Sequence, residues 1–140
     1  MTIWKSPSTA DEINARLANH MAGNLGIIFT EVGEDYLKAT MPLTHLTSQH
    51  MGIMHGGANV VLAETIANIA ATLCCEAGQT VVGLDINANH IRPGKSTVTA
   101  ITKPLHIGRT TMVWEVRIYD VDNKLNCISR FTGAVIAKPK

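Results

Sequence analysis

The stretch from residue 52 to residue 75 reads GIMHGGANVVLAETIANIAATLCC. From Gly57 to about Cys75, apolar residues return at steps of three and four, and no proline or interior glycine interrupts them. This spacing predicts one long helix of about 18 residues, ended by Gly78 and Gln79. Apolar side chains occupy nearly every face of that helix, so we expect it to be buried.

Runs typical of β-strands lie on both sides of this helix. Two precede it, joined by a hairpin-length link and followed by a polar loop at residues 44–52. Before them, Ser8 or Thr9 is expected to cap a short helix that runs to about Met21. The expected strands are residues 26–32, 36–41, 80–91, 96–103, 110–119 and 125–137.

This order of elements predicts the α+β class. We expect a strongly curved antiparallel sheet, with its last four strands in a meander, wrapped around the long helix. The sequence contains no repeat and no linker, so a single domain is expected across residues 1–140.

Composition narrows the classes of function. The 140 residues include 12 Lys and Arg against 11 Asp and Glu, a net charge of +1, which gives no basic surface for nucleic acid or a membrane. Hydrophobic residues make up 46% and charged residues only 16%, which favours a buried subunit interface. The N-terminus does not read as a secretory signal, and three cysteines favour reduced thiols, so we expect a cytoplasmic protein.

The long helix begins at a loop with adjacent glycines, His55-Gly56-Gly57. A helix start presents unpaired backbone N–H groups and the positive end of the helix dipole, which together stabilise an oxyanion. Glycine also lets a substrate carbonyl approach the backbone closely. The alternative interpretation is that the two glycines only form a tight turn.

Glu64 is the only residue between His55 and Glu76 whose side chain is charged at neutral pH. Burying a lone carboxylate is costly unless it is paired or lies in a cavity. Asn68 lies one turn further on, so the two side chains share a face of the helix. We interpret Glu64 as a general base or a nucleophile for acyl transfer. The alternative is a surface residue on the edge of the helix.

Other side chains add candidates for binding. His90 and Arg92 alternate along a strand and share one face. With His106 and Arg109 they would suit the diphosphate of coenzyme A (CoA), although a solvated strand edge fits the same pattern. The histidines have no ligand spacing with a cysteine or carboxylate, so neither a metal nor a cofactor is expected.

The sequence resembles the hotdog-fold acyl-CoA thioesterases of the PaaI type in three segments: residues 52–64, VVGLDINANHIRP at 81–93, and PLHIGR at 104–109. It is most similar to the branch that contains the bacterial thioesterases of menaquinone biosynthesis and of enterobactin proofreading. The likeness extends from Ile3 to the last strand. It implies a hotdog fold, no cofactor, and dimers that often pair into tetramers.

The resemblance also implies roles for individual residues. Glu64 matches the catalytic carboxylate, and the N–H of Gly56 matches the group that polarises the thioester carbonyl. His55 and Gln49 match side chains around the thioester. Asn68 stands where relatives often have Ser or Thr that orients water. The stretches expected to contact pantetheine and nucleotide contain Gly83, His90, Ile91, Arg92, Pro93, Ile107, Gly108, Arg109, Thr110, Thr111 and Met112.

The sequence departs from the family pattern at His50-Met51, where relatives carry Pro-Phe. A flexible thioether thus replaces a rigid aromatic ring beside the acyl group. Met51, together with Ile53 and Met54, fits either an acyl pocket or ordinary packing.

The leading hypothesis is an enzyme that hydrolyses an aromatic or medium-chain acyl-CoA to the free acid and CoA. One alternative is a proofreading thioesterase that acts on acyl groups misloaded on a carrier protein. Another is a non-catalytic acyl-CoA-binding module. A hydratase is less favoured, because no Asp/His pair stands in place of Glu64.

Helix geometry bears on the oligomeric state. Gly56 and Glu64 are eight residues apart, so they lie about 12 Å apart along one helix. A glutamate side chain recovers only part of that distance. A second, antiparallel copy of the helix would bring its own Gly56 beside Glu64. We therefore expect a homodimer with two shared sites.

Overall fold

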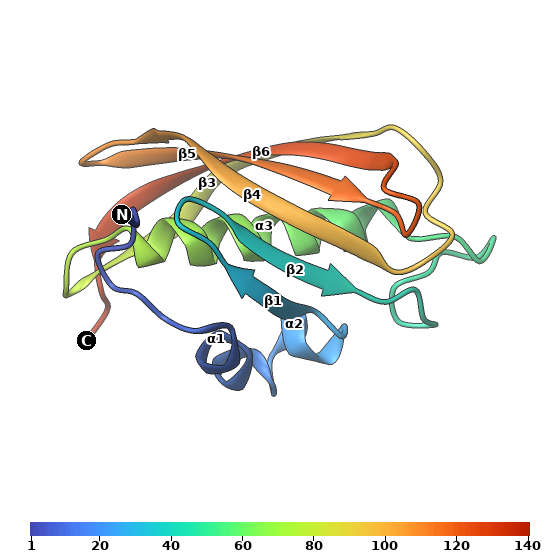
Figure 1. Cartoon of the computed structure of the whole chain (residues 1–140), viewed down its shortest axis with the longest axis horizontal. Helices are drawn as coiled ribbons and strands as arrows, with labels where there is room; N and C mark the ends of the chain where they lie inside the picture. The colour runs from blue at the N-terminus through green and yellow to red at the C-terminus, as the bar shows by residue number, and fades with distance from the viewer.

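The computed structural model describes residues 1–140. Its central helix, α3 (Gly56–Leu73), has 18 residues and runs along one face of a curved sheet (Figure 1). Leu62 and Ile66 of this helix are fully buried. The expected long buried helix is therefore confirmed. It ends at Leu73, before Gly78, which has a φ of +84° and belongs instead to the turn into the next strand.

The sheet has six strands, and every neighbouring pair is antiparallel. The order across the sheet is β1-β2-β4-β5-β6-β3. The strands are β1 (Ile28–Val32), β2 (Leu37–Met41), β3 (Gln79–His90), β4 (Val98–Ile107), β5 (Thr111–Tyr119) and β6 (Leu125–Ala137).

The predicted meander of four strands is wrong. Only β4, β5 and β6 form a meander, whereas β3 pairs with β6 from Gln79↔Ala137 to His90↔Cys127. β4 pairs with β2 instead and so joins the N-terminal hairpin to the same sheet. The alternation of apolar residues specifies which side chains face the core, but not which strand lies beside which.

β4 also reaches Ile107, beyond the end expected at Lys103. Its register with β5 shifts between Pro104 and His106. This bulge lets the strand continue past a proline, which cannot donate a hydrogen bond to the ladder.

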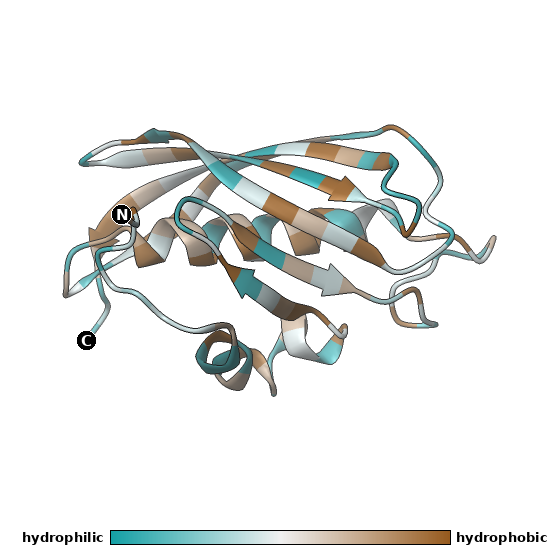
Figure 2. Ribbon diagram, in the orientation of Figure 1, coloured by the Kyte–Doolittle hydropathy of each residue, from teal (hydrophilic) through white to brown (hydrophobic).

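The core lies between α3 and the sheet, where apolar positions of both meet, brown in Figure 2. Its largest fully buried side chain is Trp114, and Phe29 and Phe131 are buried with it. Trp4 stacks on Trp114 with ring centroids 6.2 Å apart. None of the helices is both long and apolar enough to cross a membrane.

The N-terminal helix is shorter than expected. Thr9 caps α1 (Ala10–Leu17) in a capping box with Glu12. The chain then turns at His20, whose extended backbone starts a separate short helix, α2 (Met21–Asn24). The prediction of one helix to about Met21 is therefore wrong. Asn and His are weak helix formers, and the extended backbone at His20 cannot continue a helical turn.

The strand β3 lies at an edge of the sheet and leaves apolar side chains exposed. Val82 is 42% exposed and Leu84 is 61% exposed. The register with β6 shifts between Gly83 and Asp85, so Leu84 forms a bulge. A long, apolar, unpaired edge is suited to pairing with another strand.

Candidate active site

One backbone N–H at the start of α3 has no hydrogen-bond partner within the chain. The N–H of Gly57 donates to Nδ1 of His55 at 2.8 Å. Those of Ala58 and Asn59 donate to the carbonyl oxygen of His55 at 2.9 and 3.3 Å. The N–H of Gly56 donates to nothing. It remains at the positive end of the helix dipole and can polarise a carbonyl.

The two glycines provide space for neighbouring side chains rather than a special backbone conformation, since neither has a positive φ. A Cβ on Gly56 would lie 2.9 Å from Nε2 of His90. A Cβ on Gly57 would lie 2.9 Å from Nδ1 of His55. Both glycines therefore leave room for a neighbouring imidazole against the backbone.

The side chains predicted around the thioester have defined hydrogen bonds. Because Nδ1 of His55 accepts the helix N–H, the neutral imidazole carries its proton on Nε2. The amide oxygen of Gln49 accepts the N–H of Met51. Thr47, which is buried, donates to the carbonyl of Pro42 at 2.7 Å, and its own carbonyl accepts the N–H of His55 at 2.8 Å. Sequence reasoning missed Thr47, because nothing in a polar loop distinguishes a buried threonine.

A hollow of about 370 Å³ opens at the start of α3, and we name it the helix-start hollow. It brings together six of the predicted residues, Gln49 and Gly56 from the thioester set and His90, Ile91, Arg92 and Pro93 from the pantetheine set. Asn59, which sequence reasoning also missed, lies in its wall with its side chain 3% exposed. The lining consists of Gln49, Ile53, Met54, Gly56, Asn59, His90, Ile91, Arg92, Pro93 and Gly94.

Glu64 lines a different hollow of about 300 Å³, the Glu64 hollow, which also contains Leu17, His20, Met21, Ala22, Thr65, Asn68 and Ile69. In the single chain this glutamate is exposed, and no hydrogen bond or ion pair involves its carboxylate. A Cβ on Gly83 would lie 2.8 Å from Oε2 of Glu64, so glycine here leaves room for the carboxylate over β3 in its observed position.

Asn68 shares the face of Glu64, as expected, but its amide has another partner. Nδ2 donates to the carbonyl oxygen of Val81 at 2.9 Å and ties α3 to β3. That N–H is not free to orient water.

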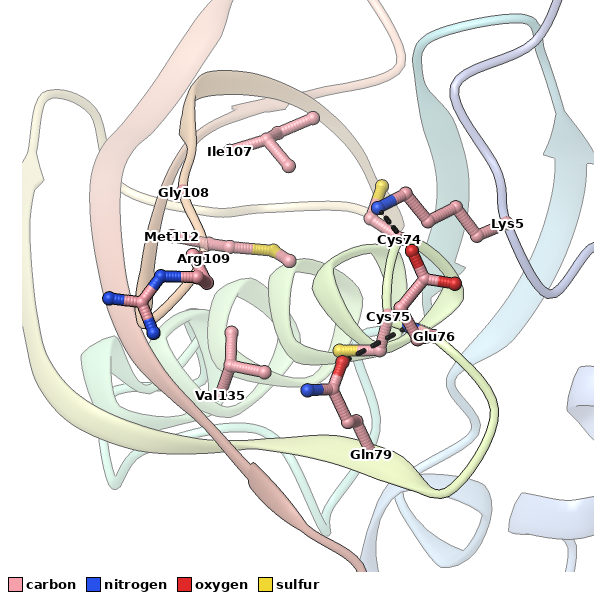
Figure 3. Close-up of a pocket in the computed structure, with 10 residues that line it drawn as sticks. All are labelled: Lys5, Cys74, Cys75, Glu76, Gln79, Ile107, Gly108, Arg109, Met112 and Val135. Carbon is pink, nitrogen blue, oxygen red and sulfur yellow. Dashed lines mark hydrogen bonds and ion pairs between the residues drawn. The ribbon is translucent and has the colours of Figure 1, made fainter.

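A third hollow of about 310 Å³, the cysteine hollow, lies at the C-terminal end of α3 (Figure 3). It contains the predicted residues Ile107, Gly108, Arg109 and Met112. The carbonyl of Thr110 accepts the N–H of Val135, and that of Thr111 accepts the N–H of Gly108. Within one chain, the structure does not bring residues 107–112 to the helix-start hollow, and Met51 is an exposed loop residue outside all three hollows.

The thiols at the cysteine hollow are not suited to act as nucleophiles. Cys74 and Cys75 are both buried, and burial raises the pKa of the Cys74 thiol to about 11. Lys5 pairs with Glu76 at 2.8 Å, and Figure 3 shows Arg109 across the hollow from this pair. Protonated thiols are poor nucleophiles, so the cysteines serve packing.

A family model described as the thioesterase superfamily matches residues 51–127, from the loop before α3 into β6. The chain belongs to the thioesterase superfamily. Its α+β architecture is the hotdog fold, as expected, and the enzyme is a thioester hydrolase.

Relatives of this thioesterase match it over nearly their whole length. It is 46% identical over 135 residues to the 1,4-dihydroxy-2-naphthoyl-CoA hydrolase of Escherichia coli, covering 96% of this chain and 99% of that one. It is 41% identical to the proofreading thioesterase EntH of Cronobacter sakazakii, covering 96% and 98%. The crystal structure of a thioesterase from Haemophilus influenzae is 47% identical, with a TM-score of 0.95 over 97% and 96% of the two chains.

Proposed function

We propose that this thioesterase hydrolyses an aromatic or medium-chain acyl-CoA to the free acid and CoA. The observation that carries the proposal is the unpaired N–H of Gly56 at the wall of the helix-start hollow. His90 and Arg92, both exposed, line the same hollow and supply donors for the phosphates of CoA. The thioester carbonyl would accept the Gly56 N–H, and the CoA arm would leave past these two side chains.

Glu64 would act on the carbonyl carbon once the N–H has polarised it. In one route it removes a proton from a water that attacks the carbon, the C–S bond breaks, and that proton passes to the departing thiolate of CoA. In the other route it attacks the carbon itself and forms a mixed anhydride as the thiolate leaves, and water then hydrolyses the anhydride to the free acid. A backbone donor aimed at the developing oxyanion contributes about 10²–10³ in kcat. The unpaired state of both the Gly56 N–H and the Glu64 carboxylate supports this division of roles.

We propose that each site is shared by two chains. In one chain Gly56 and Glu64 line different hollows, and they lie about 12 Å apart along α3. The exposed apolar edge of β3 supports pairing with a second copy. An antiparallel arrangement would put Gly56 of one chain beside Glu64 of the other. The family resemblance favours a tetramer built from two such dimers.

The Glu64 hollow supports an apolar acyl group, because Leu17, Met21 and Ile69 form much of its wall. Because one relative is a 1,4-dihydroxy-2-naphthoyl-CoA hydrolase, that ester and benzoyl-type esters are the first substrates to test. Activity on the naphthoyl ester would connect the enzyme to menaquinone biosynthesis. We propose that the enzyme acts as a single domain over residues 1–140. We also propose that it works in the cytoplasm, where its thiols remain reduced.

The test is release of free thiol from a panel of naphthoyl, benzoyl, medium-chain and long-chain CoA esters. We expect the highest kcat/KM with an aromatic or medium-chain ester. No turnover of any ester by the folded protein would contradict the proposal.

A second candidate is proofreading of acyl groups on a carrier protein, favoured by the 41% identity to a proofreading thioesterase. The measurement is kcat/KM on benzoyl-CoA against a benzoyl-loaded carrier. A clear preference for the carrier would favour this candidate.

A further inference from the structure

Three buried side chains contain nitrogen or oxygen atoms with no hydrogen-bond partner: Asn59, Trp114 and Asn126. An unpaired polar atom in the interior is costly, so each requires an explanation. Of the three, only Asn59 lines a hollow. This residue lines the helix-start hollow, and its Oδ1, shielded from solvent in the single chain, is an acceptor without a donor that a turn of the amide about the Cβ–Cγ bond would bring to the hollow.

The position of Asn59 relative to Gly56 is defined by the helix. Asn59 is three residues further along α3, so the two lie on the same face about 4.5 Å apart along the axis. A helical side chain leans back toward the helix start. The Asn59 amide therefore lies near the N–H proposed to hold the thioester carbonyl.

Packing and helix stability do not explain an asparagine here. Its neighbours in the helix, Ala58, Leu62 and Ala63, are buried and apolar. Asparagine is also a weaker helix former than alanine or leucine. The chain thus keeps a costly amide at a position where an apolar residue would favour folding.

The residues around the two hollows indicate in which orientation an acyl-CoA substrate would bind. His90 and Arg92 are exposed at this hollow and favour phosphates, whereas the Glu64 hollow is mostly apolar. The pantetheine arm of CoA would therefore cross the helix-start hollow, with the acyl group toward Glu64 of the second copy in the shared site. That arm carries an amide whose nitrogen is separated from the thioester sulfur by two carbons, so it would bring an N–H donor close to the carbonyl at Gly56.

We propose that Oδ1 of Asn59 accepts a hydrogen bond from the amide N–H of the pantetheine arm nearest the thioester. The proposal rests on the proposed function, since it requires the thioester to bind at Gly56. CoA and carrier proteins share this arm, so Asn59 recognises the part of the substrate common to both and leaves the choice of acyl group to the Glu64 hollow.

The test uses two small thioesters of the acyl group that is hydrolysed fastest in the CoA panel. One is the thioester of N-acetylcysteamine, and the other is the thioester of 2-acetoxyethanethiol, in which an oxygen replaces the N–H. We expect the parent enzyme to prefer the amide by about tenfold in kcat/KM. In Asn59→Leu, which preserves side-chain size, the ratio falls close to one, mainly through loss of rate on the amide.

A matched control separates binding from packing. Asn126→Leu also replaces a fully buried asparagine with an unpartnered amide, and Asn126 lies behind the wall of the hollow, where its backbone carbonyl accepts the N–H groups of Ile91 and Arg92, rather than in the lining. We expect this variant to keep the parent's tenfold ratio. Asn59→Leu should have a Tm equal to or above the parent's, because it removes an unpaired amide from the interior. If leucine prevents folding, Asn59→Ala provides the same comparison of the two substrates.

The outcomes distinguish the two proposals. A parent enzyme that hydrolyses acyl-CoA but shows no preference between the two small thioesters would overturn the role of Asn59 and leave the proposed function standing. A ratio that persists in the Asn59 variants, or that falls equally in Asn126→Leu, would also overturn it. Absence of turnover with CoA esters and both small thioesters would overturn the proposed function as well.

Discussion

The two ends of α3 differ in how their polar groups are satisfied. At the C-terminal end, the carbonyl of Leu73 accepts the N–H groups of Lys5 and Ser6 at 2.9 and 3.0 Å. At the N-terminal end, the N–H of Gly56 and the amide oxygen of Asn59 have no partner. One end is satisfied by its own chain, and the other leaves polar groups without a partner in the single chain. The difference indicates where to look for catalysis and where to look for stability.

The largest expected effect is that of Glu64→Gln. It keeps the size and hydrogen-bonding capacity of the side chain but removes the carboxylate, so kcat should fall by roughly 10²–10⁴. The fold should be unchanged, because Glu64 is exposed and unpaired in the chain. The matched control is Glu76→Gln at the other end of α3, which breaks only the exposed pair with Lys5 and should keep parental kcat. Activity of Glu64→Gln within a few-fold of the parent would contradict its assignment.

Mixing two inactive variants tests whether Gly56 of one chain and Glu64 of another chain form a shared active site. Gly56→Pro removes the free N–H at the first helix position, where the backbone accepts proline and the new ring would displace the His90 imidazole, and Glu64→Ala removes the carboxylate. Each alone should be inactive. After subunit exchange of equal amounts, half of the dimers are mixed and hold one intact site of two, so we expect about one quarter of parental activity. A mixture that stays inactive after verified exchange would exclude shared sites.

Arg92→Ala should act on substrate binding alone. Loss of a phosphate contact should raise KM for the CoA ester by roughly fivefold and leave kcat on the N-acetylcysteamine thioester nearly unchanged. Arg109→Ala, in the cysteine hollow, provides the comparison. An equal rise in KM would mean that assembly brings this end of α3 to the substrate, and an unchanged KM would restrict binding to the helix-start hollow. If Arg92→Ala impairs both substrates equally, that arginine is structural.

The smallest effect on activity is expected from Cys74→Ala at the C-terminal end. Burial raises the pKa of the Cys74 thiol to about 11 from an ordinary value near 9.0, so the folded state favours the protonated form. The resulting stability is present in full below about pH 9 and is lost as the pH rises to about 11. Tm measured from pH 8 to 10.5 should therefore fall more steeply for the parent than for Cys74→Ala. Parallel curves would show that Cys74 ionises equally in the folded and unfolded states.

Much of the secondary structure could be predicted, because its signals are local. The apolar steps of α3 and the alternation in the strand at 125–137 place both elements within a few residues of their observed bounds. One error arose where distant contacts decide strand pairing, and another where a local signal at the end of the first helix was not recognised. β3 pairs with β6 rather than β4, and the first helix stops at Leu17. Asn59 was missed because a single polar residue in an apolar helix has no distinct spacing.

The sequence by itself determined the long buried helix, the glycine pair at its start, the isolated Glu64 and the family. These depend on residue types at short separations along the chain. The tertiary structure decided that the Gly56 N–H stays unpaired, that Gly83 makes room for Glu64, and that Gly56, Glu64 and Arg109 occupy three separate hollows. Each of these depends on segments that meet only when the sheet wraps around α3, and no local pattern encodes such a meeting.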